Sequence, residues 1–367
     1  MSQNTPFARK KLIGLQALRG IAIFFVVLLH LTAIERKFGP GVTILPNWLS
    51  HGSPGIDLFF AISGFMMVTI SRGHFRSRAN AINFGFARFI RIYPLYWLYT
   101  AMALVAYLIN PMLVNTAQSN QADFVASFLL LPSDLIPLIN VAWTLVHQVY
   151  FYLVFTVFIL LIEERYLPFA LAGWASVIGV GQVYCLGFAN CNPALNLITH
   201  PHTLEFIAGC AIAILSQHRI NQLGRTTLLA GLVLWIVTMI AINALEPGLV
   251  VSGWQRVLRF APPALLTLYG MVALEATTPI TAPPILLQIG DASYSIFLSH
   301  VPLLSLLSRI WALVVTPDPL NHFIALTIML VTVIAFGLFS YRYIEKPLIQ
   351  KLRTWGDTHL LKDKITL

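Results

Sequence analysis

The chain has 367 residues, of which 57% are hydrophobic and only 10% are charged, and its mean hydropathy is +0.78. A soluble globular protein carries roughly 25% charged residues, so this composition excludes a soluble domain, a disordered chain and a fibrous repeat. The remaining class is a membrane protein with several spans. A chain of this length accommodates about ten helices of roughly 20 residues each.

The apolar runs are long and continuous, for example at 21–31, 228–242 and 323–339. The strands of a membrane barrel alternate apolar and polar residues, whereas helices satisfy their own backbone hydrogen bonds in lipid. We therefore predict an all-α polytopic integral membrane helical bundle with about ten transmembrane helices. The predicted spans are 12–34, 55–70, 92–110, 141–162, 167–188, 203–217, 226–245, 260–276, 292–315 and 322–344.

The formal net charge of +9 is explained by membrane topology rather than by nucleic-acid binding, because no basic face with interleaved aromatic residues is visible. Arg9–Lys11 precede the first predicted span, and a loop rich in arginine follows the second. By the positive-inside rule this side of the membrane is cytoplasmic, and both termini are predicted to lie there. The arginines assigned to that loop are Arg72, Arg76, Arg78, Arg88 and Arg91.

The first predicted span contains Arg19 and His30. Ionisable groups inside a membrane helix are costly, so each is a functional candidate by default. The two residues are separated by about three helical turns, which places them on nearly the same face and about 16 Å apart along the axis. A buried histidine is also often a satisfied core residue, and this interpretation of His30 stays open.

The second predicted span begins near Asp57, at the same outer level as His30. A carboxylate there could orient an imidazole and raise its basicity, as general-base catalysis requires. The alternative is a helix N-cap, which is an ordinary place for aspartate. Further along, Arg88 and Arg91 precede Tyr93. The planar arginine fork suits phosphate, although these arginines could instead set topology or contact anionic lipid.

The fourth and sixth predicted spans bring His147, Gln148 and Glu205 to the outer level as well. Between them lie Cys185 and Cys191, which could form a disulfide if the outside is oxidising or could stay unpaired. No Cys/His cluster has the spacing of metal ligands, so no metal is predicted.

Six motifs in order are similar to those of the membrane acyltransferase-3 family, and the exopolysaccharide or O-antigen O-acetyltransferase-like branch is the most similar. The resemblance covers nearly the full length of the chain. The motifs are Leu15–Gly20 with Arg19 and His30 at the Arg-x10-His spacing, Gly55–Phe65, Arg88–Pro94, Trp143–Leu145 with Phe151–Tyr152, Ser293–His300 and Tyr341–Leu348.

This resemblance implies a multi-pass enzyme of the bacterial inner membrane. Its transmembrane domain would cover residues 1–348, followed by a short cytoplasmic tail at 349–367. The donor would be cytosolic acyl-CoA, usually acetyl-CoA, and the acceptor a sugar hydroxyl of a surface polysaccharide or its lipid-linked precursor. Membrane lipid surrounds such an enzyme, and a separately encoded partner in polysaccharide assembly is possible. Neither a metal nor nucleic acid is implied.

The resemblance also implies residue roles. His30 would be catalytic and Arg19 part of its motif, while Arg88 and Arg91, with Tyr93 beside them, would hold the donor. The family usually has Glu where this chain has Gln148, and an amide cannot exchange a proton in this pH range. Asp57 or Glu205 could supply the missing carboxylate, and His147 next to Gln148 could alter the chemistry; the alternative is an enzyme of low or altered activity.

The predicted mechanism is acyl transfer with His30 as general base, or as the carrier of an acyl group in a covalent variant. A transporter or flippase that uses the intramembrane His and Asp residues as a proton relay is the main alternative. A haem protein with His30 and His300 as axial ligands is a second alternative.

Overall fold

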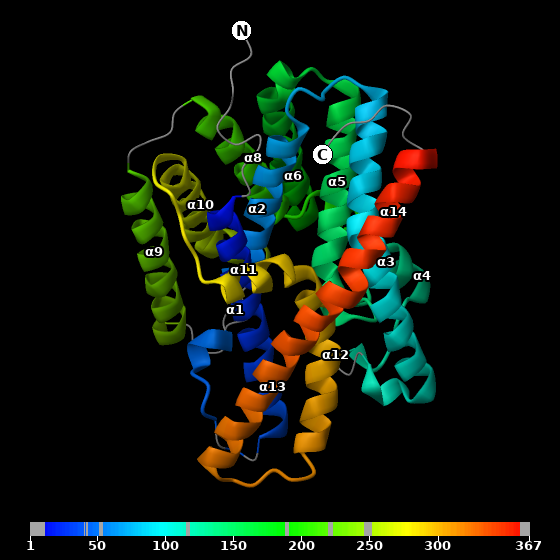
Figure 1. Cartoon of the computed structure of the whole chain (residues 1–367), viewed down its shortest axis with the longest axis vertical. Coiled ribbons are helices and arrows are strands. Elements are labelled where there is room, and N and C mark those ends of the chain that lie inside the picture. Colours follow the sequence, from blue (N-terminus) through cyan, green and yellow to red (C-terminus); the bar gives the residue numbers. More distant parts are fainter. Residues whose placement is uncertain are drawn as a thin grey trace. The chain divides into compact units, whose positions relative to one another are not determined.

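The computed structural model describes residues 12–39, 41, 43–50, 54–114, 118–187, 191–218, 223–245 and 252–359. The predicted basic arm Arg9–Lys11 lies outside these residues. Every regular element in the described part is helical, as predicted (Figure 1).

The long helices are α1 (Ile13–Phe38), α2 (Pro54–Ser71), α3 (Arg78–Ile109), α5 (Trp143–Leu161), α6 (Leu167–Gly187), α8 (Thr203–His218), α9 (Gly224–Leu245), α10 (Gly253–Thr277), α12 (Ser293–Trp311), α13 (Pro319–Ser340) and α14 (Lys346–His359). The short helices are α4 (Phe124–Leu129), α7 (Pro193–Ile198) and α11 (Pro284–Asp291). Single turns of 3-10 helix are η1 (Asn47–Ser50), η2 (Pro111–Leu113), η4 (Asn140–Ala142) and η5 (Glu164–Tyr166), and η6 (Tyr341–Glu345) is a π-helical turn.

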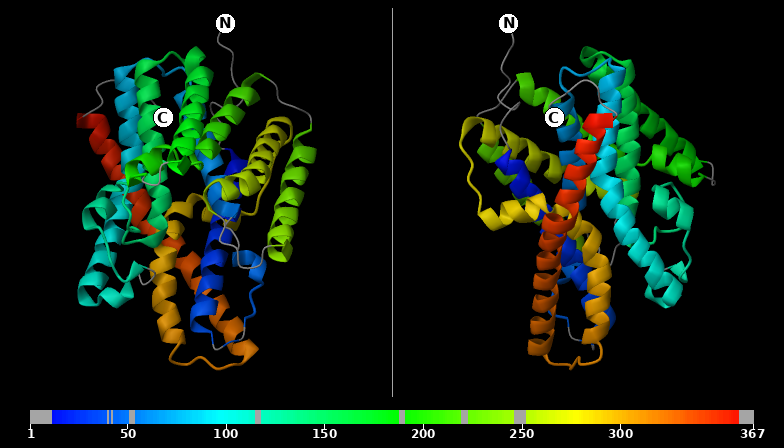
Figure 2. Two further views of the ribbon diagram at one scale, coloured as in Figure 1. Left: turned by 180° about the vertical axis from the view of Figure 1, so that it is seen from behind. Right: turned by 45° about the vertical axis from the view of Figure 1, so that its right-hand side comes forward.

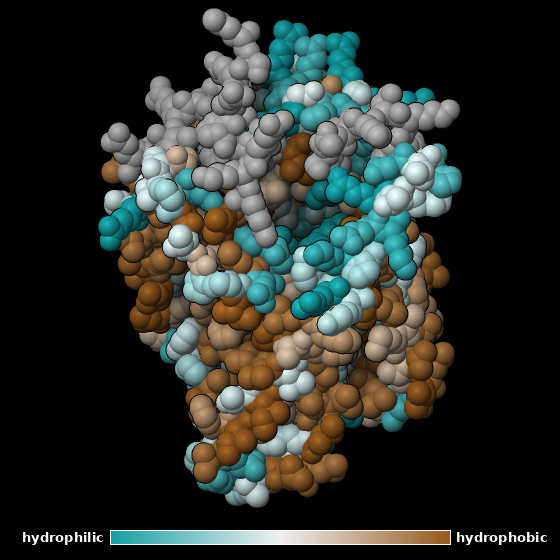
Figure 3. Space-filling model, in the orientation of Figure 1, coloured by the Kyte–Doolittle hydropathy of each residue, from teal (hydrophilic) through white to brown (hydrophobic). Residues whose placement is uncertain are grey.

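Eight helical segments in the described part are long and apolar enough to cross a membrane. Large apolar side chains lie exposed along them, as at Ile236 and Ile240 of α9 and at Phe323 and Val331 of α13. Figure 3 shows hydrophobic residues over α9 and much of α13, and more hydrophilic residues over α14. The protein is therefore a polytopic membrane helical bundle. The predicted second and ninth spans form α2 and α12, which are not among the eight, so the total of ten stays a prediction.

Helix α3 begins at Arg78, well before the predicted start of the third span at residue 92. The Ser77 side chain accepts a hydrogen bond from the Asn80 backbone N–H at 3.3 Å and caps the helix there. Placing Arg88 and Arg91 in a loop was wrong, because both lie inside α3. The helix satisfies its own backbone hydrogen bonds, and the long arginine side chains carry their charged groups away from it, so a run of arginines does not interrupt the helix.

The chain folds into two compact units. One unit combines Lys10–Phe59 with Arg219–Tyr343, and so contains α1, α9, α10, α11, α12 and α13. In this unit α9 and α10 run side by side in opposite directions, and α12 and α13 do the same (Figures 1 and 2). Helix α1 packs on α11 and α12. A Cβ atom at Gly20 would lie 2.5 Å from the Leu286 carbonyl oxygen, so glycine is needed for this close approach.

The other unit combines Phe60–His218 with Ile344–Leu367. Helices α3 and α5 lie side by side in it, and α14 packs across α3 (Figure 2). The Phe60–Ser71 part of α2 meets α8 at two glycines. A Cβ atom at Gly64 would lie 1.9 Å from the Phe206 carbonyl oxygen, and one at Gly209 would lie 2.0 Å from that of Ala61. The two backbones are therefore in direct contact, as small residues permit in membrane helices.

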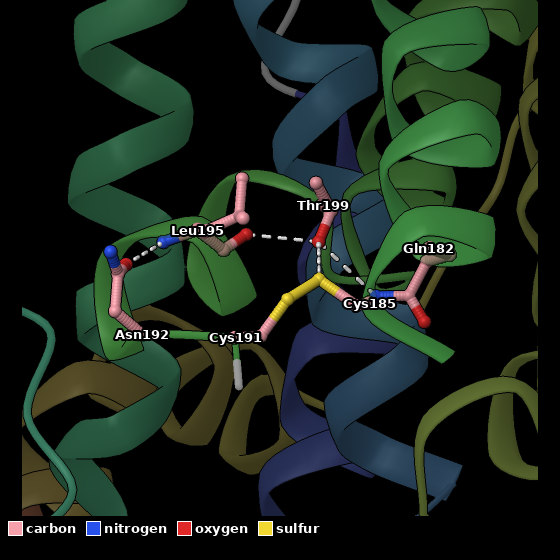
Figure 4. Close-up of a disulfide and its surroundings, with 6 residues drawn as sticks. All are labelled: Gln182, Cys185, Cys191, Asn192, Leu195 and Thr199. Carbon is pink, nitrogen blue, oxygen red and sulfur yellow. Dashed lines mark hydrogen bonds between the residues drawn. A yellow bond between two sulfur atoms is a disulfide. The ribbon is translucent and has the colours of Figure 1, made fainter. Parts of the chain in front are cut away.

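A disulfide joins Cys185, near the end of α6, to Cys191, just before α7 (Figure 4). The Gln182 amide nitrogen donates to the Thr199 hydroxyl at 3.2 Å, and that hydroxyl donates to the Leu195 carbonyl at 2.9 Å. These bonds fix the short connection from α7 to α8. The disulfide that the sequence left open is therefore formed, as in proteins with an oxidised outer face.

Candidate functional site

The first polar cluster lies in the unit that contains α1 and α12. His30 of α1 and His300 of α12 have ring centroids 4.8 Å apart, with their planes at 79°. The His300 Nε2 atom lies 3.4 Å from the His30 Nδ1 atom. His300 is fully buried, whereas His30 as a whole residue is partly buried. Of the two histidines, His30 is therefore the candidate for contact with a reactant.

Backbone carbonyls fix the tautomers of both rings. The His30 Nδ1 atom lies 2.9 Å from the Val26 carbonyl oxygen, and the His300 Nδ1 atom lies 2.7 Å from that of Phe297. A carbonyl oxygen only accepts, so each Nδ1 atom carries the hydrogen and each Nε2 atom keeps its lone pair. The His300 Nε2 atom faces the His30 Nδ1–H group and can share it with Val26. The Nε2 atom of His30 is then the basic nitrogen of the pair.

Arg19 lies on the same helix and binds the start of α12. Its Nη2 atom donates to the Ser293 hydroxyl at 2.9 Å. Gln16, one turn earlier, donates to the Asp291 carboxylate at 2.6 Å. Both bonds hold α1 against the junction of α11 and α12, and α12 carries His300. Arg19 therefore contacts the helix that positions the partner of His30.

Asp57 binds a residue that the sequence did not connect with it. Its two carboxylate oxygens accept from the Nε and Nη2 atoms of Arg256 at 3.1 and 2.6 Å. Asp57 is fully buried and Arg256 nearly so, which makes this a desolvated bidentate pair. Among the described residues, the hydrogen bonds of His30 go to Val26 and His300 and not to Asp57.

The contact between His30 and His300 also bears on the haem alternative. Axial ligands must lie on opposite faces of a porphyrin, with iron between their nitrogen atoms. Here a nitrogen of each ring is already in direct contact with the other at 3.4 Å. No macrocycle fits between them in this structure.

The second polar cluster lies in the unit that contains α5 and α8. The ring centroids of His147 and His200 are 4.6 Å apart, and those of His200 and His202 are 4.7 Å apart. The His202 Nδ1 atom lies 3.5 Å from a carboxylate oxygen of Glu205. His147 and Glu205 were predicted site residues, and the structure brings them into one buried cluster.

His200 and His202 were missed in the sequence, although the pair forms a His-x-His pattern just before α8. That spacing was the available signal. Imidazole and carboxylate groups are also metal-ligand types. However, the His200 Nδ1 atom already accepts the His202 backbone N–H at 3.3 Å, so this lone pair is used within the protein.

Gln148 lies next to His147 on α5, and its amide is held in one orientation. The Ser63 hydroxyl donates to the Gln148 Oε1 atom at 3.1 Å. The Nε2 group is buried and makes no hydrogen bond within the described part of the chain. A buried donor of this kind requires a partner, and a substrate oxygen would supply one.

The two arginines of α3 have different environments. The Arg88 guanidinium lies over the rings of Phe84 and Tyr152, with its carbon 5.6 and 5.7 Å from their centroids, and forms no ion pair among the described residues. Arg91 forms a salt bridge with Glu345, which is fully buried in η6. Tyr93 does not join them, because its hydroxyl donates to the Leu129 carbonyl of α4 at 3.0 Å.

Comparison with known sequences gives a match to a family model described as an acyltransferase domain (acyltransferase-3), which covers residues 12–342. The chain is similar to the exopolysaccharide production protein ExoZ of Rhizobium meliloti, at 28% identity over 82% of this chain and 91% of that protein. It is also similar to the O-acetyltransferase OatA of Staphylococcus aureus, at 22% identity over 94% of this chain and 58% of the longer OatA. No solved structure matches.

Proposed function

Because the chain belongs to the acyltransferase-3 family of membrane acyltransferases, we propose that it transfers an acetyl group from cytosolic acetyl-CoA to a sugar hydroxyl. The acceptor is a surface polysaccharide or its lipid-linked precursor. Its similarity to an exopolysaccharide production protein and to an O-acetyltransferase supports this assignment. The proposed location is the bacterial inner membrane, where a separate assembly partner would deliver or receive the glycan.

The observation that carries the proposal is the basic Nε2 atom of the half-buried His30. In the proposed step this atom accepts the proton of the acceptor hydroxyl while the hydroxyl oxygen attacks the thioester carbon. A C–O bond forms, the C–S bond breaks, and the imidazolium returns its proton to the departing thiolate of CoA. The Val26 carbonyl and the His300 Nε2 atom stabilise the Nδ1–H side of the ring as charge develops.

In a covalent variant of the mechanism, the His30 Nε2 atom itself attacks the thioester carbon and releases CoA thiolate. The acceptor hydroxyl then attacks the acyl-imidazole, the C–N bond breaks, and the hydroxyl proton passes to the ring. Protein quenched without acceptor would retain radiolabel from acetyl-CoA only in this variant.

Arg88 is the proposed ligand for a phosphate of the donor. Its charge is not neutralised by a described carboxylate, and the rings of Phe84 and Tyr152 hold it in place. Arg91 is proposed to position this part of α3 through Glu345. Gln148, in place of the usual Glu, is proposed to donate to a substrate oxygen through its Nε2 group.

The test uses purified protein in nanodiscs, acetyl-CoA labelled on its acetyl group and a glycan fraction from the host. We expect His30→Ala to lower transfer by about 10²–10⁴-fold, the usual contribution of a general base, without loss of the folded protein. His359→Ala is the matched control, because His359 is exposed on α14. Transfer by His30→Ala at the wild-type rate would contradict the proposal.

A further inference from the structure

A groove with a volume of about 300 Å³ lies between α9 and α10. Both helices belong to the same unit and run in opposite directions. Its walls come from the second half of α9, including Val237 and Ile242, and from the first half of α10, including Leu258 and Arg259. None of these residues takes part in the proposed acyl transfer.

Glycines explain why the two helices separate at this end and not at the other. Cβ atoms at Gly224, Gly231 and Gly270 would lie 2.3 to 2.7 Å from backbone atoms of the opposite helix. All three glycines lie in the first half of α9 or the second half of α10, where the backbones touch. The lining of the groove contains no glycine, and larger side chains hold the helices apart there.

Two prolines in α10 add polar character to the groove. Pro262, which lines it, and Pro263 have no N–H group. The carbonyls of Leu258 and Arg259, one turn earlier, therefore lack their usual intrahelical donors. Backbone acceptors and the Arg259 guanidinium thus lie at the start of an otherwise apolar groove.

The outer edges of the groove are apolar and exposed. Val237 is 52% exposed and Leu258 is 68% exposed, as expected for side chains that face hydrocarbon. Trp235 and Phe260 stack at 5.7 Å in the packed core beside the groove. The surroundings of Arg259 therefore combine an apolar channel, a cation and lipid-facing edges. Arg259 is the charged residue of the groove lining.

We propose that this groove binds one anionic phospholipid, with a hydrocarbon chain between α9 and α10 and the phosphate on Arg259. An uncharged chain alone would not use the guanidinium, and a free anion would not use the apolar walls. Arginine binds phosphate through two parallel N–H groups, and basic pockets between membrane helices are known to hold lipid headgroups. This inference does not depend on the proposed acyl transfer.

The experiment is native mass spectrometry of the full-length protein after titration with phosphatidylglycerol or phosphatidylcholine in neutral detergent. We expect one tightly retained phosphatidylglycerol per chain and at least tenfold weaker retention of phosphatidylcholine. Arg259→Gln removes the phosphate ligand and Ala241→Phe fills the groove, so each should weaken phosphatidylglycerol retention about tenfold or more. The matched controls are Arg225→Gln and Ala230→Phe, which change exposed residues of α9 outside the groove and should bind as wild type.

Three results would overturn the proposal. Retention unchanged in both groove variants would show that the lipid binds elsewhere. Equal retention of the two lipids would remove the role of charge. If glycerol phosphate displaced phosphatidylglycerol at the same concentration as the lipid itself, the hydrocarbon chain would have no role in binding. Size-exclusion profiles and helical circular dichroism show whether each variant is folded, and Arg259→Lys gives a second test of charge without bidentate geometry.

Discussion

At the scale of single residues, the reactivity of His30 depends on hydrogen bonds made by its other nitrogen. The Val26 carbonyl is one turn away in α1, so that bond follows from the helix itself. His300 is 270 residues away in the sequence, and no local pattern predicts that contact. The sequence supplied both histidines and the face that Arg19 and His30 share. It assigned a carboxylate as the partner of His30, because it could not show that Asp57 is bound to Arg256.

Replacement of His300 tests its positioning role. We expect His300→Ala to lower kcat about five- to tenfold, because one neutral hydrogen bond contributes about 1 kcal/mol. The KM for acetyl-CoA should stay unchanged, since the fully buried His300 would act only through its contact with His30. His300→Gln, which can place an acceptor near the Nε2 position, should recover part of the lost rate. Equal loss in both variants would indicate a packing defect instead.

At the scale of elements, most predicted spans matched the observed helices within a few residues, because long apolar runs bounded by polar residues specify them. Helix α9, predicted at 226–245, is Gly224–Leu245. Helix α3 was the largest exception, since its first turns are rich in arginine and were predicted as a loop. Helix α10 also begins earlier, at Gly253 and not at the predicted residue 260. The first part of the predicted tail, residues 349–359, is also helical, because α14 extends to His359. Charge density marks the membrane boundary and not the end of a helix.

The salt bridge between Arg91 and Glu345 ties α3 to the start of α14, and breaking it should be costly. Arg91→Leu leaves the fully buried Glu345 carboxylate without its partner, which should destabilise the protein by roughly 3 kcal/mol. The double variant Arg91→Leu with Glu345→Leu should recover most of this loss. Thermal unfolding in detergent measures both.

The control for this pair is Arg76→Gln, which breaks the exposed pair with Glu163 and should change stability by less than about 1 kcal/mol. If the double variant at Arg91 and Glu345 lost as much stability as the two single variants together, the result would contradict the expected coupling between these residues.

The contact between α2 and α8 should not tolerate even a methyl group. Gly64→Ala would place its Cβ atom against the Phe206 carbonyl, so the helices must separate, at a cost of about 1–3 kcal/mol or more. Gly179→Ala in α6 is the matched control, because open space surrounds that position. We expect Gly64→Ala to lower the unfolding temperature and Gly179→Ala to leave it unchanged. Equal unfolding temperatures would show that the close contact is absent in the membrane.

At the scale of the whole molecule, composition alone predicted the class of the protein, a helical membrane bundle. The sequence could not predict how the chain divides into two units, because each unit combines segments far apart in the sequence. The same limit applied to the cluster of His147, His200 and Glu205, whose members come from α5, the α7–α8 connection and α8.

The predicted membrane orientation can be tested with reporter fusions in a bacterial host. Alkaline phosphatase, which is active only outside the cytoplasm, should be active when fused after Asn192 and inactive when fused after Glu163. This pattern follows from the positive-inside rule and agrees with a disulfide at Cys185 and Cys191. The reverse pattern would overturn the assignment of both termini to the cytoplasm.

The π-helical turn η6 makes the spacing of the chain critical just before α14. A π turn contains one residue more than an α turn needs. Removal of one residue within Tyr341–Glu345 can therefore be absorbed as a regular α turn, which leaves the following residues at nearly the same rotation about the helix axis. Insertion of a further residue has no such route and would rotate α14 by about 100°, so that Gly356 would no longer face Phe86 of α3. This segment should therefore tolerate a one-residue deletion better than a one-residue insertion.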